Sequence, residues 1–146
     1  MKNIAIILVL LLGSAGAAKL LGANANTAGR IGLAAVFGFT ALGHFVRRDQ
    51  MAAMIPPSVP SRAAIVVVSG LFEALLAVFL LVPSYSGMAG IVAGVFLVLV
   101  TPLNIYAALK RVDFGGHAAG PIYLLVRLPL QAALVMWTYW FAIRGG

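Results

Sequence analysis

The feature that most constrains this fold is a succession of apolar segments, each about as long as a membrane is thick. They span roughly residues 3–22, 29–46, 63–82, 87–109 and 120–143. A helix needs about 20 mostly apolar residues to cross the hydrocarbon core of a bilayer. The chain is 63% hydrophobic and 9% charged, whereas soluble domains have about 25% charged residues. We therefore expect an all-α, polytopic transmembrane helix bundle whose main partner is the lipid bilayer.

The first apolar segment has two interpretations. Lys2, the run "IAIILVLLL" and the small-residue stretch "GSAGAA" match a secretory signal peptide, in which Ala15-Gly16-Ala17 would be the cleavage site. The alternative is a transmembrane helix that is kept in the mature protein. We expect the retained helix.

Loop charges predict the orientation of the chain. With five spans, the N-terminus and the second and fourth loops share one side of the membrane. That side has six basic residues, which are Lys2, Arg47, Arg48, Arg62, Lys110 and Arg111. The other side has three, which are Lys19, Arg30 and Arg144. Because basic loops stay in the cytoplasm, we expect a multi-pass membrane protein with its N-terminus in the cytoplasm and its C-terminus outside.

Five polar side chains interrupt the apolar segments: His44, Glu73, Asn104, Arg127 and Gln131. At about 1.5 Å per residue, Glu73 lies about 16 Å deep, and Asn104 and Arg127 each lie roughly 9 Å deep. His44 lies near the boundary. All five fall in the cytoplasmic half, whereas the other half of these helices is nearly pure hydrocarbon. We expect them to form an intramembrane polar cluster.

Glu73 and Arg127 are the deep charges of this cluster. A charged side chain at mid-membrane costs about 2.5–3.5 kcal/mol or more, so it usually faces the bundle interior and has a partner. We expect the two to face one cavity and to compensate each other, directly or through water or a ligand. They would form either a structural ion pair or the polar floor of a ligand or proton site. For Asn104 and Gln131 we expect hydrogen bonds to carbonyls that nearby prolines leave free.

Several other chemistries find no support in the sequence. There is no cysteine, which excludes intrinsic thiol chemistry. Two histidines without a spaced carboxylate make no metal site. No nucleophile–base pair or phosphate loop identifies a catalytic residue or a reaction. The net charge of +7 would suggest nucleic acid in a soluble chain, but here the basic residues flank apolar segments, so we expect no nucleic-acid partner.

Six short motifs resemble the DoxX-like family of small bacterial membrane proteins. They are "GHF" (43–45), "MIPPSVP" (54–60), "SGLFEALLAVFLLVP" (69–83), "TPLNIY" (101–106), "RLPLQ" (127–131) and "WTYW" (137–140). The resemblance extends from about Gly29 to Arg144. It implies a four-helix domain in a bacterial inner membrane over residues 29–146, with residues 1–28 as an added N-terminal helix and turn. The family pattern highlights His44, Phe45, Pro56, Pro57, Gly70, Glu73, Pro102, Asn104, Arg127, Pro129 and Gln131.

What the resemblance implies about function is an association with redox systems. DoxX relatives include a subunit of an archaeal thiosulfate:quinone oxidoreductase, and mycobacterial members are associated with redox and thiol homeostasis. We therefore expect an accessory component of a membrane redox system, with a redox partner subunit and a quinone-like lipophilic ligand at the polar cluster. The alternatives are a small-solute or proton carrier that uses Glu73, and a structural or assembly subunit. Oligomerisation is left open.

Overall fold

The computed structural model describes residues 2–145 and contains helices and turns, with no strand in that range. The helices are α1 (Lys2–Leu20), α2 (Ala25–Val46), α3 (Arg48–Ala52), α4 (Arg62–Leu81), α5 (Ser86–Leu99), α6 (Thr101–Leu109) and α7 (Leu124–Thr138). A short 3₁₀ helix, η1 (His117–Tyr123), precedes α7, and a π-helical turn, η2 (Tyr139–Ile143), follows it.

By length and composition, five helical segments of the described chain can cross a membrane. They are Asn3–Leu20, Ala25–Val46, Arg62–Leu81, Ser86–Leu109 and His117–Ile143. The fold class is therefore the predicted transmembrane helix bundle. Large apolar side chains such as Val68, Leu125 and Met136 are exposed on its outside, where lipid takes the place that water has around a soluble protein.

The first turn lies earlier than the sequence suggested. Gly22 has a positive φ of 92°, a backbone conformation that glycine adopts without steric cost, and it ends α1. The Asn24 side chain then accepts a hydrogen bond from the Thr27 amide at 2.8 Å and caps the start of α2. The proposed boundary at residue 28 therefore falls inside α2. Helix α1 packs closely on α2, because a Cβ on Gly32 would lie 2.5 Å from the Leu11 carbonyl oxygen.

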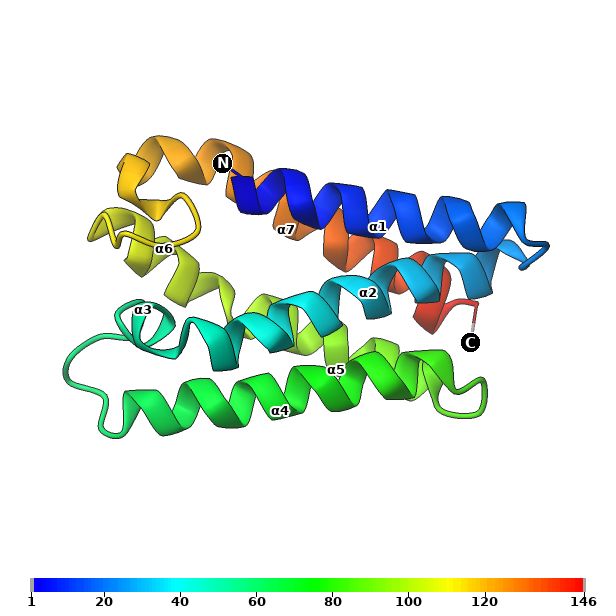
Figure 1. Cartoon of the computed structure of the whole chain (residues 1–146), viewed down its shortest axis with the longest axis horizontal. Helices are drawn as coiled ribbons and strands as arrows, with labels where there is room; N and C mark the ends of the chain where they lie inside the picture. Colours follow the sequence, from blue (N-terminus) through cyan, green and yellow to red (C-terminus); the bar gives the residue numbers. More distant parts are fainter. Residues whose placement is uncertain (1, 146) are drawn as a thin grey trace.

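The fourth span is interrupted near its middle. Helix α5 ends at Leu99 and α6 begins at Thr101, with Pro102 in its first turn. Proline is accepted at such a position because the first amides of a helix have no intrahelical partner. Figure 1 shows the resulting change of direction between α5 and α6.

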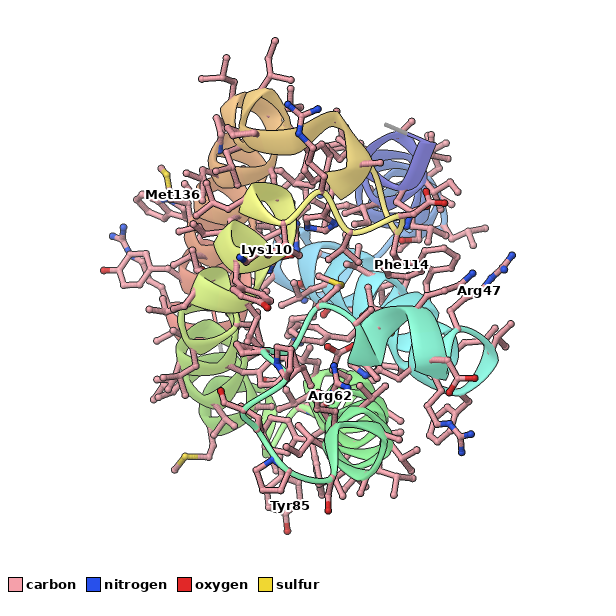
Figure 2. The ribbon with its side chains drawn as sticks, turned by 90° about the vertical axis from the view of Figure 1, so that its left-hand side faces the viewer. Arg47, Arg62, Tyr85, Lys110, Phe114 and Met136 are labelled. Carbon is pink, nitrogen blue, oxygen red and sulfur yellow. The ribbon has the colours of Figure 1, made fainter. Side chains whose placement is uncertain are left out.

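The two ends of the bundle differ in character (Figure 1). One end holds the N-terminus, α3 and the connection from α6 to η1; the other holds the C-terminus, the α1–α2 turn and the α4–α5 turn. We call the first the basic end. Figure 2 looks onto it, with Arg47, Arg62 and Lys110 around the bundle. The second and fourth loops thus share one end, as predicted.

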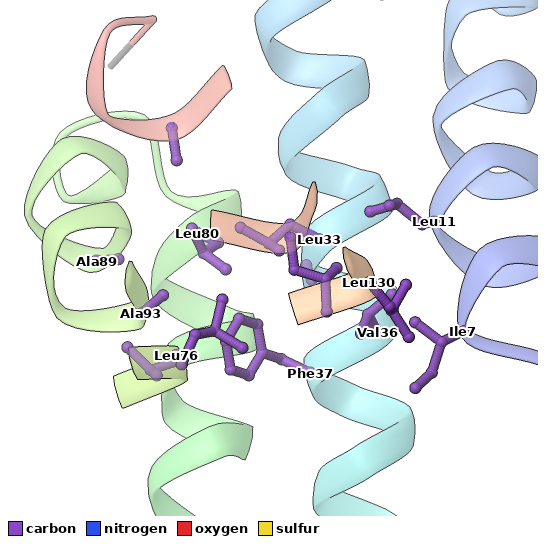
Figure 3. Packing of buried hydrophobic residues seen from close by; sticks show 14 of the residues in the cluster. Ile7, Leu11, Leu33, Val36, Phe37, Leu76, Leu80, Ala89, Ala93 and Leu130 are labelled. Atoms are coloured by element: carbon purple, nitrogen blue, oxygen red, sulfur yellow. The ribbon is translucent and has the colours of Figure 1, made fainter. Parts of the chain in front are cut away.

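The hydrophobic core runs between the helices along the bundle, from Ile4 and Tyr123 near the basic end to Ala142 near the other end. Leu33 and Phe37 of α2 meet Leu76 and Leu80 of α4, and small residues of α5 let the helices approach (Figure 3). Leu33 and Leu80 are completely or almost completely buried. This packed layer closes the interior beyond the polar cluster.

Candidate functional site

Glu73 lies in the middle of α4 and is buried. Its Oε1 atom is 3.4 Å from Nε2 of His44. The sequence placed both residues in one polar cluster, with His44 near the membrane boundary and Glu73 about 16 Å deep. The two side chains meet because α4 extends further toward the basic end than α2 does (Figure 1). The last turn of α2 therefore lies beside the middle of α4, and α3 follows α2 in the chain.

The backbone around His44 fixes the orientation of its ring. The Nδ1 atom is 2.8 Å from the Val66 carbonyl oxygen and 3.1 Å from the Ser69 hydroxyl. Gly70 allows this approach, since a Cβ there would lie 2.5 Å from the His44 Cβ. Because a carbonyl oxygen only accepts, Nδ1 carries a proton and donates it.

Arg127 of α7 has a different partner from the one predicted. Its Nε donates to the Asn104 side-chain oxygen at 3.2 Å, while its buried Nη1 makes no hydrogen bond. Among the described residues, the ion pairs are His44–Glu73 and the exposed pair Arg48–Asp49. Glu73 and Arg127 therefore make no direct contact in the described part of the chain. Of the expected ways in which their charges compensate each other, those through water or a ligand are left.

Asn104 and Gln131 both bond to carbonyls near the break in the fourth span, but not to the carbonyls four residues before Pro102 and Pro129 that the prolines were expected to leave free. The Asn104 side-chain amide donates to the Val100 carbonyl at 3.0 Å, and the Gln131 amide donates to the Leu97 carbonyl. The second hydrogen bond joins α7 to α5. Gln131 Oε1 is buried without a partner.

Two cavities flank Arg127. The large cavity, of about 370 Å³, opens at the basic end between α1, the end of α2, α3 and the α6–η1 connection. Its polar lining residues are Asn3, Thr40, Arg47, Asn104, His117 and Arg127. The small cavity, of about 60 Å³, lies deeper, and its polar lining consists of Thr40, Glu73 and Arg127. Ile7, Thr40 and Arg127 line both, so these residues separate the two spaces.

Glu73 and Arg127 therefore both line one cavity, as expected, and that cavity is the small one. Of the predicted cluster, Asn104 and Arg127 also line the large cavity. Three of its members hold a buried polar atom without a hydrogen bond, namely Glu73 Oε2, Arg127 Nη1 and Gln131 Oε1. Such atoms are uncommon in folded proteins and mark places where water or a ligand binds.

His117 is a site residue that sequence reasoning missed. The glycine-rich stretch around it suggested a flexible loop, yet its side chain is 3% exposed. Nδ1 is 2.7 Å from the Phe114 carbonyl oxygen, and the ring packs edge-on against Tyr123 at 4.8 Å. The Tyr123 hydroxyl in turn donates to the Gly115 carbonyl at 2.8 Å. Nε2 is buried without a partner. The glycine pair Gly115-Gly116, both with positive φ, was the available signal of a tight turn.

A second polar contact lies at the opposite end of the bundle, where nearly pure hydrocarbon was expected. Arg30 of α2 is 9% exposed; it donates to the Ser86 hydroxyl and, at 3.1 Å, to the Thr27 hydroxyl. Trp137 Nε1 also donates to the Gly29 carbonyl at 2.9 Å. These contacts connect α2 with α5 and α7. They join helices, and Arg30, Thr27 and Ser86 line neither of the two cavities that flank Arg127.

Comparison with known proteins places the chain in a family. No curated protein and no solved structure matches it. One family's sequence model matches residues 33–142, which covers α2 from Leu33 to the π-helical turn η2 and includes every residue of the polar cluster. The chain belongs to this family, which is described as a domain of unknown function, DUF8561.

Proposed function

We propose that this protein binds a small lipophilic molecule with a hydrogen-bonding head group, such as a quinone, in the large cavity at the basic end. In this proposal it acts as an accessory component of a membrane redox system, with a partner subunit that supplies or takes up electrons. The resemblance of the cluster motifs to DoxX-like proteins favours this class. The observation that carries the proposal is the pair of unpartnered polar atoms, Arg127 Nη1 and His117 Nε2, beside one cavity.

The two atoms have complementary hydrogen-bonding roles. Arg127 Nη1 is a donor. His117 donates through Nδ1 to the Phe114 carbonyl, so Nε2 of the neutral ring is an acceptor. A quinone carbonyl accepts from an arginine, and the hydroxyl of the reduced form donates to an imidazole nitrogen. The site therefore offers a partner to each form of the head group.

The cavity has the size and lining that such a ligand requires. Its volume of about 370 Å³ falls within the range of roughly 300–1,000 Å³ that is usual for small-molecule sites. Apolar side chains of α2, including Phe39 and Leu42, line it and are exposed on the outside of the bundle. An isoprenoid tail could leave the cavity along this face and enter the lipid.

The proposal is tested by binding of a short-chain quinone to the full-length protein in nanodiscs, together with mass spectrometry of the lipids that co-purify. We expect saturable binding that Arg127→Gln weakens by roughly tenfold or more, because a hydrogen bond from a charged group contributes about 1.5–3 kcal/mol. Arg62→Gln is the matched control, since it removes the same charge from the same end at a residue that does not line the cavity. Absence of saturable binding to the wild type would disprove the proposal.

A further inference from the structure

The contact between His44 and Glu73 constrains where a proton can lie. Nδ1 of His44 already carries a proton, because it faces the Val66 carbonyl oxygen at 2.8 Å. Nε2 faces Glu73 Oε1 at 3.4 Å. If neither atom carried a proton, two lone pairs would oppose each other in a medium of low dielectric constant, where such repulsion is strong. The contact is attractive only when one proton lies between the two atoms.

That proton can be held in two equivalent ways. Either His44 is an imidazolium opposite a carboxylate, or a neutral imidazole accepts from a carboxylic acid. The pair is neutral overall in both arrangements, which is the least costly state for ionisable groups within a membrane. Titratable groups this close bind and release protons as one unit.

The small cavity has room for water beside this pair, and three of its lining residues also line the large cavity at the basic end. The Glu73 carboxyl group lines it, and Oε2 makes no hydrogen bond. About 60 Å³ is room for a water molecule, which needs about 10–15 Å³ of probe volume and at least two polar partners. Thr40 and Arg127 supply further partners and also line the large cavity. Toward the opposite end, the small cavity is lined by apolar side chains such as Leu33, Phe37 and Leu134.

Few charged groups face the pair. Arg127 of α7 is across the small cavity, and Ser69 of α4 contacts His44. The lining from α1 and α5 is apolar. The charged residues of α3, Arg48 and Asp49, pair with each other and are exposed. Among these described groups, Arg127 is therefore the one charged side chain inside the bundle that faces the His44–Glu73 pair.

We propose that His44 and Glu73 form a proton-binding site that holds one proton and exchanges it, through water in the small cavity, with the basic end of the bundle alone. Exchange moves the proton from the carboxyl group of Glu73 to that water, which passes it on beside Arg127. The proposal requires no bound quinone, so it stands or falls independently of the proposed function.

The composition of the chain makes the proton count measurable. Glu73 is the only glutamate, and His44 and His117 are the only histidines. The full-length protein in lipid bilayers, labelled with ¹³C-glutamate and ¹⁵N-histidine, therefore gives one glutamate carboxyl signal and two imidazole sets in NMR. At neutral pH we expect one proton in total on His44 Nε2 and Glu73.

Variants separate this site from its surroundings. In Glu73→Gln the amide donates to Nε2 directly, so we expect no proton on His44 Nε2 at neutral pH. The His117 signals should stay unchanged as an internal control. Ser69→Ala should leave the count at one, because the Val66 carbonyl still holds the Nδ1 proton. A wild-type count of zero or two would overturn the one-proton site.

The direction of exchange is tested in sealed vesicles. Accessibility of a label on Ser58→Cys, in the second loop, reports which way the basic end faces. A pH jump on that side should change the proton count within the mixing time, whereas the same jump on the other side should not. A response to the opposite side would overturn the one-sided access.

Discussion

Gly70 is the position at which one added methyl group should disturb the site most. A Cβ there would lie 2.5 Å from the His44 Cβ, 3.2 Å from its Cγ and 3.4 Å from the Ala41 carbonyl oxygen. Carbon atoms pack at about 3.5–4.0 Å, so Gly70→Ala requires α2 and α4 to separate by roughly 1 Å. The first obstacle is the Cβ of His44, which is fixed to the backbone and cannot rotate away.

Overpacking of this kind costs about 1–3 kcal/mol. The separation also lengthens the 3.4 Å contact between His44 and Glu73 beyond ion-pair distance. Gly38→Ala is the matched control on α2, because a Cβ at Gly38 meets nothing within 4 Å. There the change removes a flexible residue from the middle of a helix, which stabilises it by about 0.5–1 kcal/mol. The free energy of unfolding should therefore be lower than that of the wild type in Gly70→Ala and higher in Gly38→Ala.

The free energy of unfolding can be measured by titrating the purified protein with a denaturing detergent in mixed micelles. We expect Gly70→Ala to lower this free energy by about 1–3 kcal/mol. If Gly70→Ala proves as stable as Gly38→Ala, the close crossing of α2 and α4 at His44 is wrong.

Three further predictions concern topology and charge compensation. Cysteines placed at Ser58 and Gly116, in the second and fourth loops, should react with an impermeant reagent only after cells are opened, because both loops are basic; labelling of intact spheroplasts would reverse the orientation. Intact-mass measurement of the membrane-extracted protein should show the first segment still attached, whereas loss of about the first 17 residues would support the signal-peptide alternative. Glu73→Gln and Arg127→Gln should each destabilise the protein more than the double variant does, since each single change leaves the other charge uncompensated beside the small cavity. We expect a coupling energy of about 0.5–3 kcal/mol, and strictly additive losses of stability would show that the two charges do not interact.

The sequence alone predicted the features that depend on composition and on local spacing. The length of an apolar segment determines whether it can span a membrane, whatever the rest of the chain packs against it. All five spans therefore appear within a few residues of their predicted bounds. The break before α6 was not predicted, although Pro102, whose effect on the backbone is local, lies in the first turn of α6. That Glu73, Asn104 and Arg127 would face the interior follows from the cost of leaving such groups in lipid.

The choice of partners was decided by the tertiary structure. Depth counted along each helix put His44 at the boundary and Arg127 beside Glu73, because this count assumes that all helices begin at the same level. In the fold, α2 ends deeper than α4 begins and crosses it at Gly70, which brings His44 to Glu73 and leaves Arg127 to Asn104. His117 became a buried site residue because a turn of two glycines folds its ring inward. The sequence thus showed which polar residues lie within the spans. Which of them meet was decided by how far the helices are offset and where they cross. The offset and the crossing depend on packing between segments far apart in the chain.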